Sequence, residues 1–97
     1  MKKIIIILIV LPFLTKAQNT LKVNFKNEKT KEVLVGVSVV LKNVQSGTTT
    51  DTSGFAELKN IPNGKQTIVF SLIGFTTIEK NIVFPETTKL EIFLEPS

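Results

Sequence analysis

Polar and apolar residues alternate with a period of two along most of the chain beyond residue 20. The segment 21–26 sets three apolar residues on one side and three polar residues on the other: Leu21, Val23 and Phe25 against Lys22, Asn24 and Lys26. Similar alternation recurs over 37–42, 67–72 and 89–95, with a looser copy over 76–84. This period is typical of half-buried β-strands.

Turn-forming residues separate these segments: Ser46-Gly47, Ser53-Gly54, Pro62-Asn63-Gly64 and Pro85. Short strands that recur about every 8–12 residues indicate a sandwich or a barrel. The many valines, isoleucines and threonines favour strands, and no segment keeps the 3.6-residue period of a helix. The sequence therefore predicts an all-β sandwich of about seven strands, with no helix after the N-terminal segment.

The alternation also predicts which side chains form the core. Three sets of apolar residues share a face within their segments: Val37, Val39 and Leu41; Ile68, Phe70 and Leu72; Leu90, Ile92 and Leu94. Most phenylalanines beyond residue 17 are at positions that indicate core, and the possible exceptions are Phe84 and Phe93. Phe93 is out of phase with its apolar neighbours. Its exposure would suggest a contact with another protein, although single exposed apolar residues usually have no such role.

The N-terminal segment has a different composition. Lys2 and Lys3 precede an apolar run over 4–11, and Pro12 ends it. A helix over 4–14 would be about 16 Å long, which is too short for the roughly 30 Å of a bilayer core. A cleaved signal peptide is therefore favoured over an uncleaved membrane anchor.

The cleavage site follows from two small residues. Thr15 and Ala17 occupy positions −3 and −1 of a signal peptidase site. We expect a secretory signal peptide over 1–17, cut after Ala17 to leave Gln18 at the start of a mature domain over 18–97. No cysteine follows the apolar run, so a bacterial lipoprotein anchor is not expected. Export places the domain in the periplasm or at the outer membrane, with no membrane span in the mature chain.

Removal of the signal peptide changes the charge balance. The whole chain has 12 Lys+Arg and 8 Asp+Glu. Three of the lysines lie within 1–17, so the mature net charge is 9 − 8 = +1. All the cations are lysines, and arginine is the residue that grips phosphate and guanine in two-pronged contacts. Nucleic acid is therefore not an expected partner, and the absence of cysteine excludes disulfides.

Asp51 and Gly54 lie between two predicted strands. Asp51 could accept a hydrogen bond from a backbone N–H two residues on, as in an Asx turn, and Gly54 could adopt a positive φ. A calcium loop is the alternative, but calcium needs several oxygen ligands at fixed spacing. Thr52 and Ser53 follow instead of further carboxylates. A structural turn is therefore favoured over a metal site.

Catalytic groups are scarce. The chain has neither histidine nor cysteine, which excludes Ser-His, Cys-His and His-metal sites. Carboxylates pair only as Glu28/Glu32 and Glu91/Glu95, which indicate solvated charge. Ser71 or Ser38 with a lysine is the remaining option, and no positioned base supports it. We expect a protein that is not an enzyme and has no cofactor.

The segment from Val33 to Phe75 resembles the carboxypeptidase regulatory-like domain, a transthyretin-like β-sandwich of Greek-key topology. Within that family it is most similar to the N-terminal extension of SusC-type TonB-dependent outer-membrane receptors. The matching positions are Leu34, Gly36, Val37, Val39, Thr50, Asp51, Gly54, Phe55, Leu58, Pro62, Gly64, Ser71, Gly74 and Phe75. The resemblance extends over about 21–94. It implies an accessory module, because the chain stops about where such receptors continue into plug and barrel.

The chain departs from the family pattern at several turns and strands. Lys31 replaces a usual glycine, Val33 and Val35 replace common prolines, and tyrosines are replaced at Gln66, Leu72 and Phe75. The chain has no Trp or Tyr, which are the usual platforms for sugars, so carbohydrate binding ranks last. The resemblance implies an envelope module that binds a receptor or surface lipoprotein through its surface or an edge strand. A passive structural or remnant domain is the alternative.

Overall fold

The computed structural model describes residues 19–42, 44 and 46–97. The expected signal peptide, with Ala17 and Gln18, lies outside the described residues. The described residues form strands, turns and loops, and none of them is helical. Accordingly, this part of the chain offers no helix that could cross a membrane.

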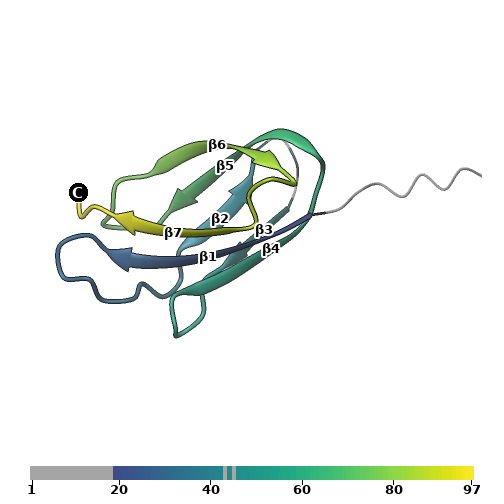
Figure 1. Ribbon diagram of the computed structural model, residues 1–97. Coiled ribbons are helices and arrows are strands. Elements are labelled where there is room, and N and C mark those ends of the chain that lie inside the picture. Colours follow the sequence, from purple (N-terminus) through teal and green to yellow (C-terminus); the bar gives the residue numbers. More distant parts are fainter. Residues whose placement is uncertain (1–18, 43, 45) are drawn as a thin grey trace, which may run out of the picture.

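Seven strands form the described part of the chain (Figure 1). They are β1 (Asn19–Asn27), β2 (Ser38–Leu41), β3 (Ser46–Thr49), β4 (Phe55–Ile61), β5 (Gly64–Ser71), β6 (Ile78–Phe84) and β7 (Lys89–Leu94). They make two sheets: sheet A in the order β4-β1-β7 and sheet B in the order β3-β2-β5-β6. The predicted all-β sandwich is confirmed.

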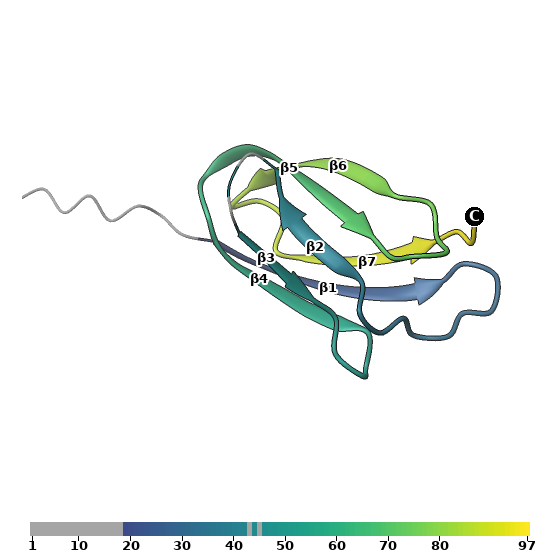
Figure 2. The same cartoon turned by 180° about the vertical axis from the view of Figure 1, so that it is seen from behind.

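The chain crosses between the sheets several times. All pairs are antiparallel except β1 with β7, which is parallel. Loops at one end of the sandwich hold residues 28–37, 50–54, 72–77 and 95–97; we call this the loop end. At the opposite end β1 begins, as Figure 2 also shows.

The core lies between the sheets and follows the period of two. The largest fully buried side chains come from both sheets: Phe25, Phe70, Phe84, Leu21, Leu41, Ile61, Ile68, Leu94, Val23, Val37 and Val39. The rings of Phe25 on β1 and Phe70 on β5 meet edge-on, with centroids 5.2 Å apart. This contact joins the sheets, and such pairs contribute about 0.5–1.5 kcal/mol beyond area burial.

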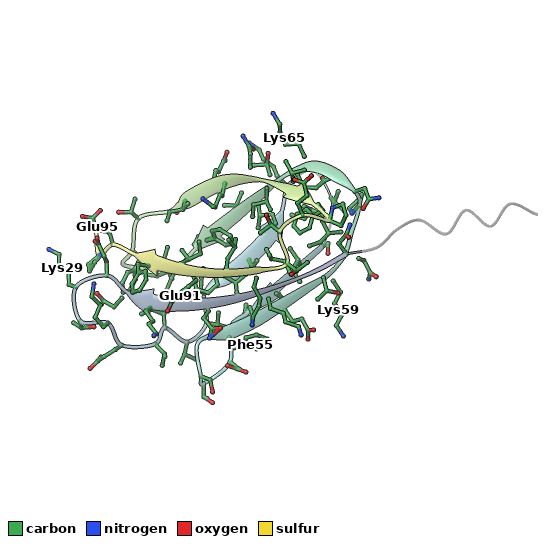
Figure 3. All side chains as sticks on the ribbon, viewed as in Figure 1. Lys29, Phe55, Lys59, Lys65, Glu91 and Glu95 are labelled. Atoms are coloured by element: carbon green, nitrogen blue, oxygen red, sulfur yellow. The ribbon has the colours of Figure 1, made fainter. Side chains whose placement is uncertain are left out.

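Two details of the predicted core differ. Leu72 and Leu90 are only partly buried and pack against the rim of the core. Of the two proposed exceptions, Phe84 is buried, whereas Phe93 is 39% exposed. Phe55 is half-buried instead of core, because it precedes the buried Ala56 and so points to the outer side of β4 (Figure 3).

The predicted turn at Ser46-Gly47 is wrong. Both residues belong to β3, and Gly47 pairs with Val40 on β2. A Cβ on Gly47 would lie 3.2 Å from the carbonyl oxygen of Val39, so the glycine allows β2 and β3 to approach closely. The chain reverses before Ser46, whose N–H donates to the carbonyl of Val44 at 2.8 Å.

Candidate interaction surface

Asp51 makes the hydrogen bonds of an Asx turn. Its Oδ1 accepts from the backbone N–H of Ser53 at 2.8 Å and from that of Phe55 at 3.1 Å. Its carbonyl also accepts from the N–H of Gly54 at 2.9 Å. The carboxylate is thus engaged by the backbone of its own turn. Across the described residues, no three potential metal ligands come together.

Gly54 lies at φ +75°, in the left-handed region. An added Cβ would lie 2.9 Å from both the carbonyl oxygen of Phe25 and the Cβ of Val33. The N–H of Phe25 donates to the carbonyl of Gly54 at 2.8 Å, and that of Leu34 donates to the carbonyl of Phe25 at 3.0 Å. Glycine is therefore required here both by conformation and by the close approach of three backbone segments.

Thr50 is the one buried polar side chain in the described part of the chain. Its hydroxyl donates to the carbonyl of Leu34 at 2.8 Å and accepts from the N–H of Val37 at 2.9 Å. The backbone N–H of Thr50 also donates to the carbonyl of Val37 at 3.1 Å. Thr50, Asp51 and Gly54 belong to the segment 50–54, where the chain passes from β3 of sheet B to β4 of sheet A. Together they hold this segment and the loop before β2 in place, so their role is structural.

The candidate catalytic residues do not assemble into a site. Ser38 and Ser71 are directly opposite on β2 and β5, and the structure shows no ion pair or hydrogen bond between either side chain and a lysine among the described residues. Glu91 forms an ion pair with Lys26 at 3.2 Å on the outer face of sheet A, where both side chains are substantially exposed. Glu95 lies at the loop end (Figure 3). These carboxylates are surface charges.

The most exposed large apolar side chain belongs to Ile73, in the loop between β5 and β6. It is 98% exposed, and among the described residues no other large apolar side chain comes close to this value. Ile73 borders an open hollow of about 460 Å³ at the loop end. The hollow is lined by Gly36, Ser38, Ser71, Leu72, Ile73, Gly74, Phe75 and Thr77.

Two other exposed apolar residues lie in the loop before β2, at the same end of the domain, although neither lines the hollow. Val35 precedes Gly36 and is 53% exposed, and Val33 is also exposed. Because Gly36 lines the hollow with Ile73, the two loops present apolar side chains on one end of the domain. We call Val33, Val35, Ile73 and the hollow the apolar end surface. This surface was not singled out from the sequence, although the alternation that groups Leu72 with Ile68 and Phe70 puts Ile73 on the opposite face.

Phe93 is exposed but has a partner. The ammonium of Lys31 lies 5.0 Å from the centroid of its ring, a cation–π contact. Lys31 itself adopts φ +66°, the left-handed conformation that explains why glycine is usual at this position in the resembling family. The exposure of Phe93 alone therefore does not define a binding site.

Solved structures with the same architecture come from larger bacterial proteins. One is the crystal structure of the type II Coh3ScaB cohesin–XDoc_M2ScaA X-dockerin complex, a C-terminal interface mutant, from Acetivibrio cellulolyticus. It has a TM-score of 0.65 and 20% identity, with 76% of this chain and 52% of that chain covered. Another is the TIE protein of Bacillus anthracis, with a TM-score of 0.57, 29% identity, and 81% of this chain and 16% of that chain covered. The chain thus spans about half or less of these neighbours.

A known sequence family matches nearly the whole domain, whereas no individual curated protein sequence matches the chain. The sequence model of the CarboxypepD_reg-like domain matches residues 14–97, which include every described strand. The chain belongs to the CarboxypepD_reg-like domain family.

Proposed function

We propose that the domain is a non-catalytic interaction module of the bacterial envelope, which binds a receptor or surface lipoprotein after export. The observation that carries this proposal is the exposure of Ile73 beside the hollow of the apolar end surface. An isoleucine held fully in water at a loop tip contributes nothing to the core. It would contribute once a partner covers it, at about 25 cal/mol per Å² of apolar area removed from water.

The charges around this surface are consistent with protein binding. The loop end carries both signs, from Glu28, Lys29, Lys31, Glu32, Asp51 and Glu95. A mixed polar rim around an apolar centre is the arrangement found in protein–protein interfaces. The family resemblance supports a TonB-dependent receptor, or a surface lipoprotein that works with one, as the partner.

The test is photo-crosslinking in intact cells of the native host. A photoreactive residue replaces Ile73, and a second variant carries it at Val44, which is 47% exposed and lies at the opposite end of the sandwich. We expect one envelope protein to be captured reproducibly from position 73 and not from position 44. Equal capture from both positions, or capture of nothing above background, would favour a passive domain.

A further inference from the structure

The two sheets leave four strand edges: β4 and β7 in sheet A, and β3 and β6 in sheet B. An edge strand presents unpaired N–H and C=O groups that can pair with another chain. Folded domains therefore protect their edges with short strands, bulges, prolines or inward-pointing charges. The four edges of this domain differ in that protection.

Three of the edges are protected. β3 has only four residues. β4 has a bulge, because its pairing with β1 shifts register between Asn19 and Leu21, and Asn60 adopts φ +62°. β6 carries Lys80 on its core-facing side, in phase with the buried Ile82 and Phe84.

β7 has none of these features over its six residues. Among the described residues, a segment other than β1 pairs with it only beyond its end: the N–H of Thr76 donates to the carbonyl of Glu95 at 2.8 Å, and that of Ser97 to the carbonyl of Gly74 at 2.9 Å. β7 runs without proline or register shift, and its core-facing side chains are all apolar: Leu90, Ile92 and Leu94. The carbonyl of Thr88, just before β7, accepts from the N–H of Lys22 on β1, and the carbonyl of Leu94 accepts from the N–H of Glu28, just after β1. Backbone groups alternate in direction along a parallel ladder. Those of residues 89, 91 and 93 therefore point to the free edge.

The inner surface beside this edge is incompletely covered. β3 and β4 lie against one another at one margin of the sandwich, whereas β6 and β7 make no comparable contact at the other. Leu90 on β7 and Ile78 on β6 are only partly buried. Lys80 is exposed although its register partner Ile68 is fully buried on the same side of sheet B.

We call the incompletely covered surface between β6 and β7 the gap. Lys80 places a positive charge beside it. Glu79, the preceding residue, points to the other side of β6 and forms an ion pair with Lys42 at 3.3 Å. No carboxylate of the described residues lies within ion-pair distance of Lys80. A strand placed beside β7 would reduce the hydration of this ammonium, and a facing carboxylate would offset that cost.

We propose that the free edge of β7 accepts one extended strand of the partner protein, with apolar side chains at alternate positions and a central carboxylate that pairs with Lys80. The apolar side chains would cover Leu90 and Ile78, and the backbone would pair with residues 89, 91 and 93, as in strand addition. This inference rests on the proposed function for the existence of a protein partner. It adds the edge and the chemistry of the bound segment.

The test uses two synthetic peptides and the protein expressed from its full coding sequence, in the form in which the host releases it. The probe is Thr-Val-Thr-Glu-Thr-Val-Thr, and the control replaces its central Glu with Lys. Both sequences are palindromic, so parallel and antiparallel strands present the same pattern to the gap. We expect the Glu peptide to shift the backbone amide resonances of residues 89, 91 and 93 and to bind about fivefold tighter than the Lys peptide.

Charge reversal and a backbone change test the two halves of the inference. Lys80→Glu should reverse the preference between the peptides, whereas the matched Lys59→Glu, on the opposite edge strand β4, should leave it unchanged. Glu91→Pro removes an outward N–H and should abolish binding of the Glu peptide. Glu91→Ala also loses the ion pair with Lys26 but keeps the N–H, so it should still bind. Dispersed amide spectra establish that each variant is folded.

Several results would overturn the inference: equal binding of both peptides, resonance shifts confined to other strands, or no shift at all. A dimer in sedimentation experiments that Glu91→Pro dissociates would instead assign the edge to a second copy of the chain. If the partner captured in cells is retained by Lys80→Glu and Glu91→Pro, this inference fails and the proposed function stands. If no partner is captured from any position, the proposed function itself fails.

Discussion

The hydroxyl of Thr50 joins two backbone groups of the loop before β2, since it donates to the carbonyl of Leu34 and accepts from the N–H of Val37. Both bonds are buried, and they connect positions 16 and 13 residues apart in the chain. The side chain thus adds two bonds to the backbone contact between Thr50 and Val37, which continues the pairing of β2 with β3. Its neighbours Asp51 and Gly54 form the turn that follows.

Replacement of Thr50 by valine should destabilise the domain strongly. Valine keeps the shape but leaves the carbonyl of Leu34 and the N–H of Val37 without this partner, and each buried unsatisfied group costs about 1–3 kcal/mol. Urea denaturation should show a loss of about 2 kcal/mol or more. Thr50→Ser keeps the hydroxyl and should retain most of the stability. Equal losses in the two variants would assign the effect to packing instead.

Gly54→Ala should cost more than Gly36→Ala. Both glycines have similar positive φ, +75° and +82°, so the conformational strain of an alanine is comparable. A Cβ at Gly54 would meet backbone and Val33 at 2.9 Å, whereas a Cβ at Gly36 would meet nothing within 4 Å. The difference between the two melting temperatures measures the close approach alone. Equal melting temperatures would mean that the three segments can move apart at little cost.

Asp51→Ala should lower stability by about 1 kcal/mol, the usual value of one net hydrogen bond. Asp51→Asn keeps an acceptor at Oδ1 and should lose less. Calcium should leave the melting temperature of the parent protein unchanged, because the carboxylate already serves the N–H groups of Ser53 and Phe55. A calcium-dependent rise in melting temperature that disappears in Asp51→Ala would replace the turn with a metal site.

Local patterns and long-range pairing explain what the sequence could predict. The period of two correctly assigned the buried sides of β1 and β2, because alternation is a property of each strand by itself. Ser46-Gly47 resembled a turn because the dipeptide is common in turns. In the structure, however, a glycine is favoured at position 47 because the backbone of β2 lies close to it across the sheet. Phe55 was assigned to the core but is half-buried, and Phe84 was named as a possible exception but is buried. Each lies at the end of its strand, where the phase of the alternation is hard to fix from a few residues.

The candidate surfaces were harder to predict for the same reason. A sequence does not state which strand lies at an edge, so neither the free edge of β7 nor the inward position of Lys80 could be identified before the sheets were known. The alternation puts Ile73 out of phase with Leu72, but only the structure shows that it lies in a loop, 98% exposed, beside a hollow.

Export is predicted to remove the N-terminal segment. Signal peptidase should cut after Ala17, because a basic start, an apolar run and small residues at −3 and −1 are the features it recognises. The intact mass of protein recovered from the native envelope should correspond to a chain that begins at Gln18. Recovery of the chain with Met1 from a cytosolic fraction would contradict export and, with it, an envelope partner.

Ile73→Ser should separate binding from stability. The side chain is 98% exposed, so its loss should change the free energy of unfolding by no more than about 0.5 kcal/mol, as for ordinary surface substitutions. Recovery of the envelope partner should nevertheless fall, because the apolar area that the partner covers is lost. Val44→Ser, an exposed apolar change at the opposite end, serves as the control for both measurements. A marked loss of stability in Ile73→Ser would show that the loop packs on the domain and would remove Ile73 from the interface; unchanged recovery of the partner would place the contact elsewhere on the domain.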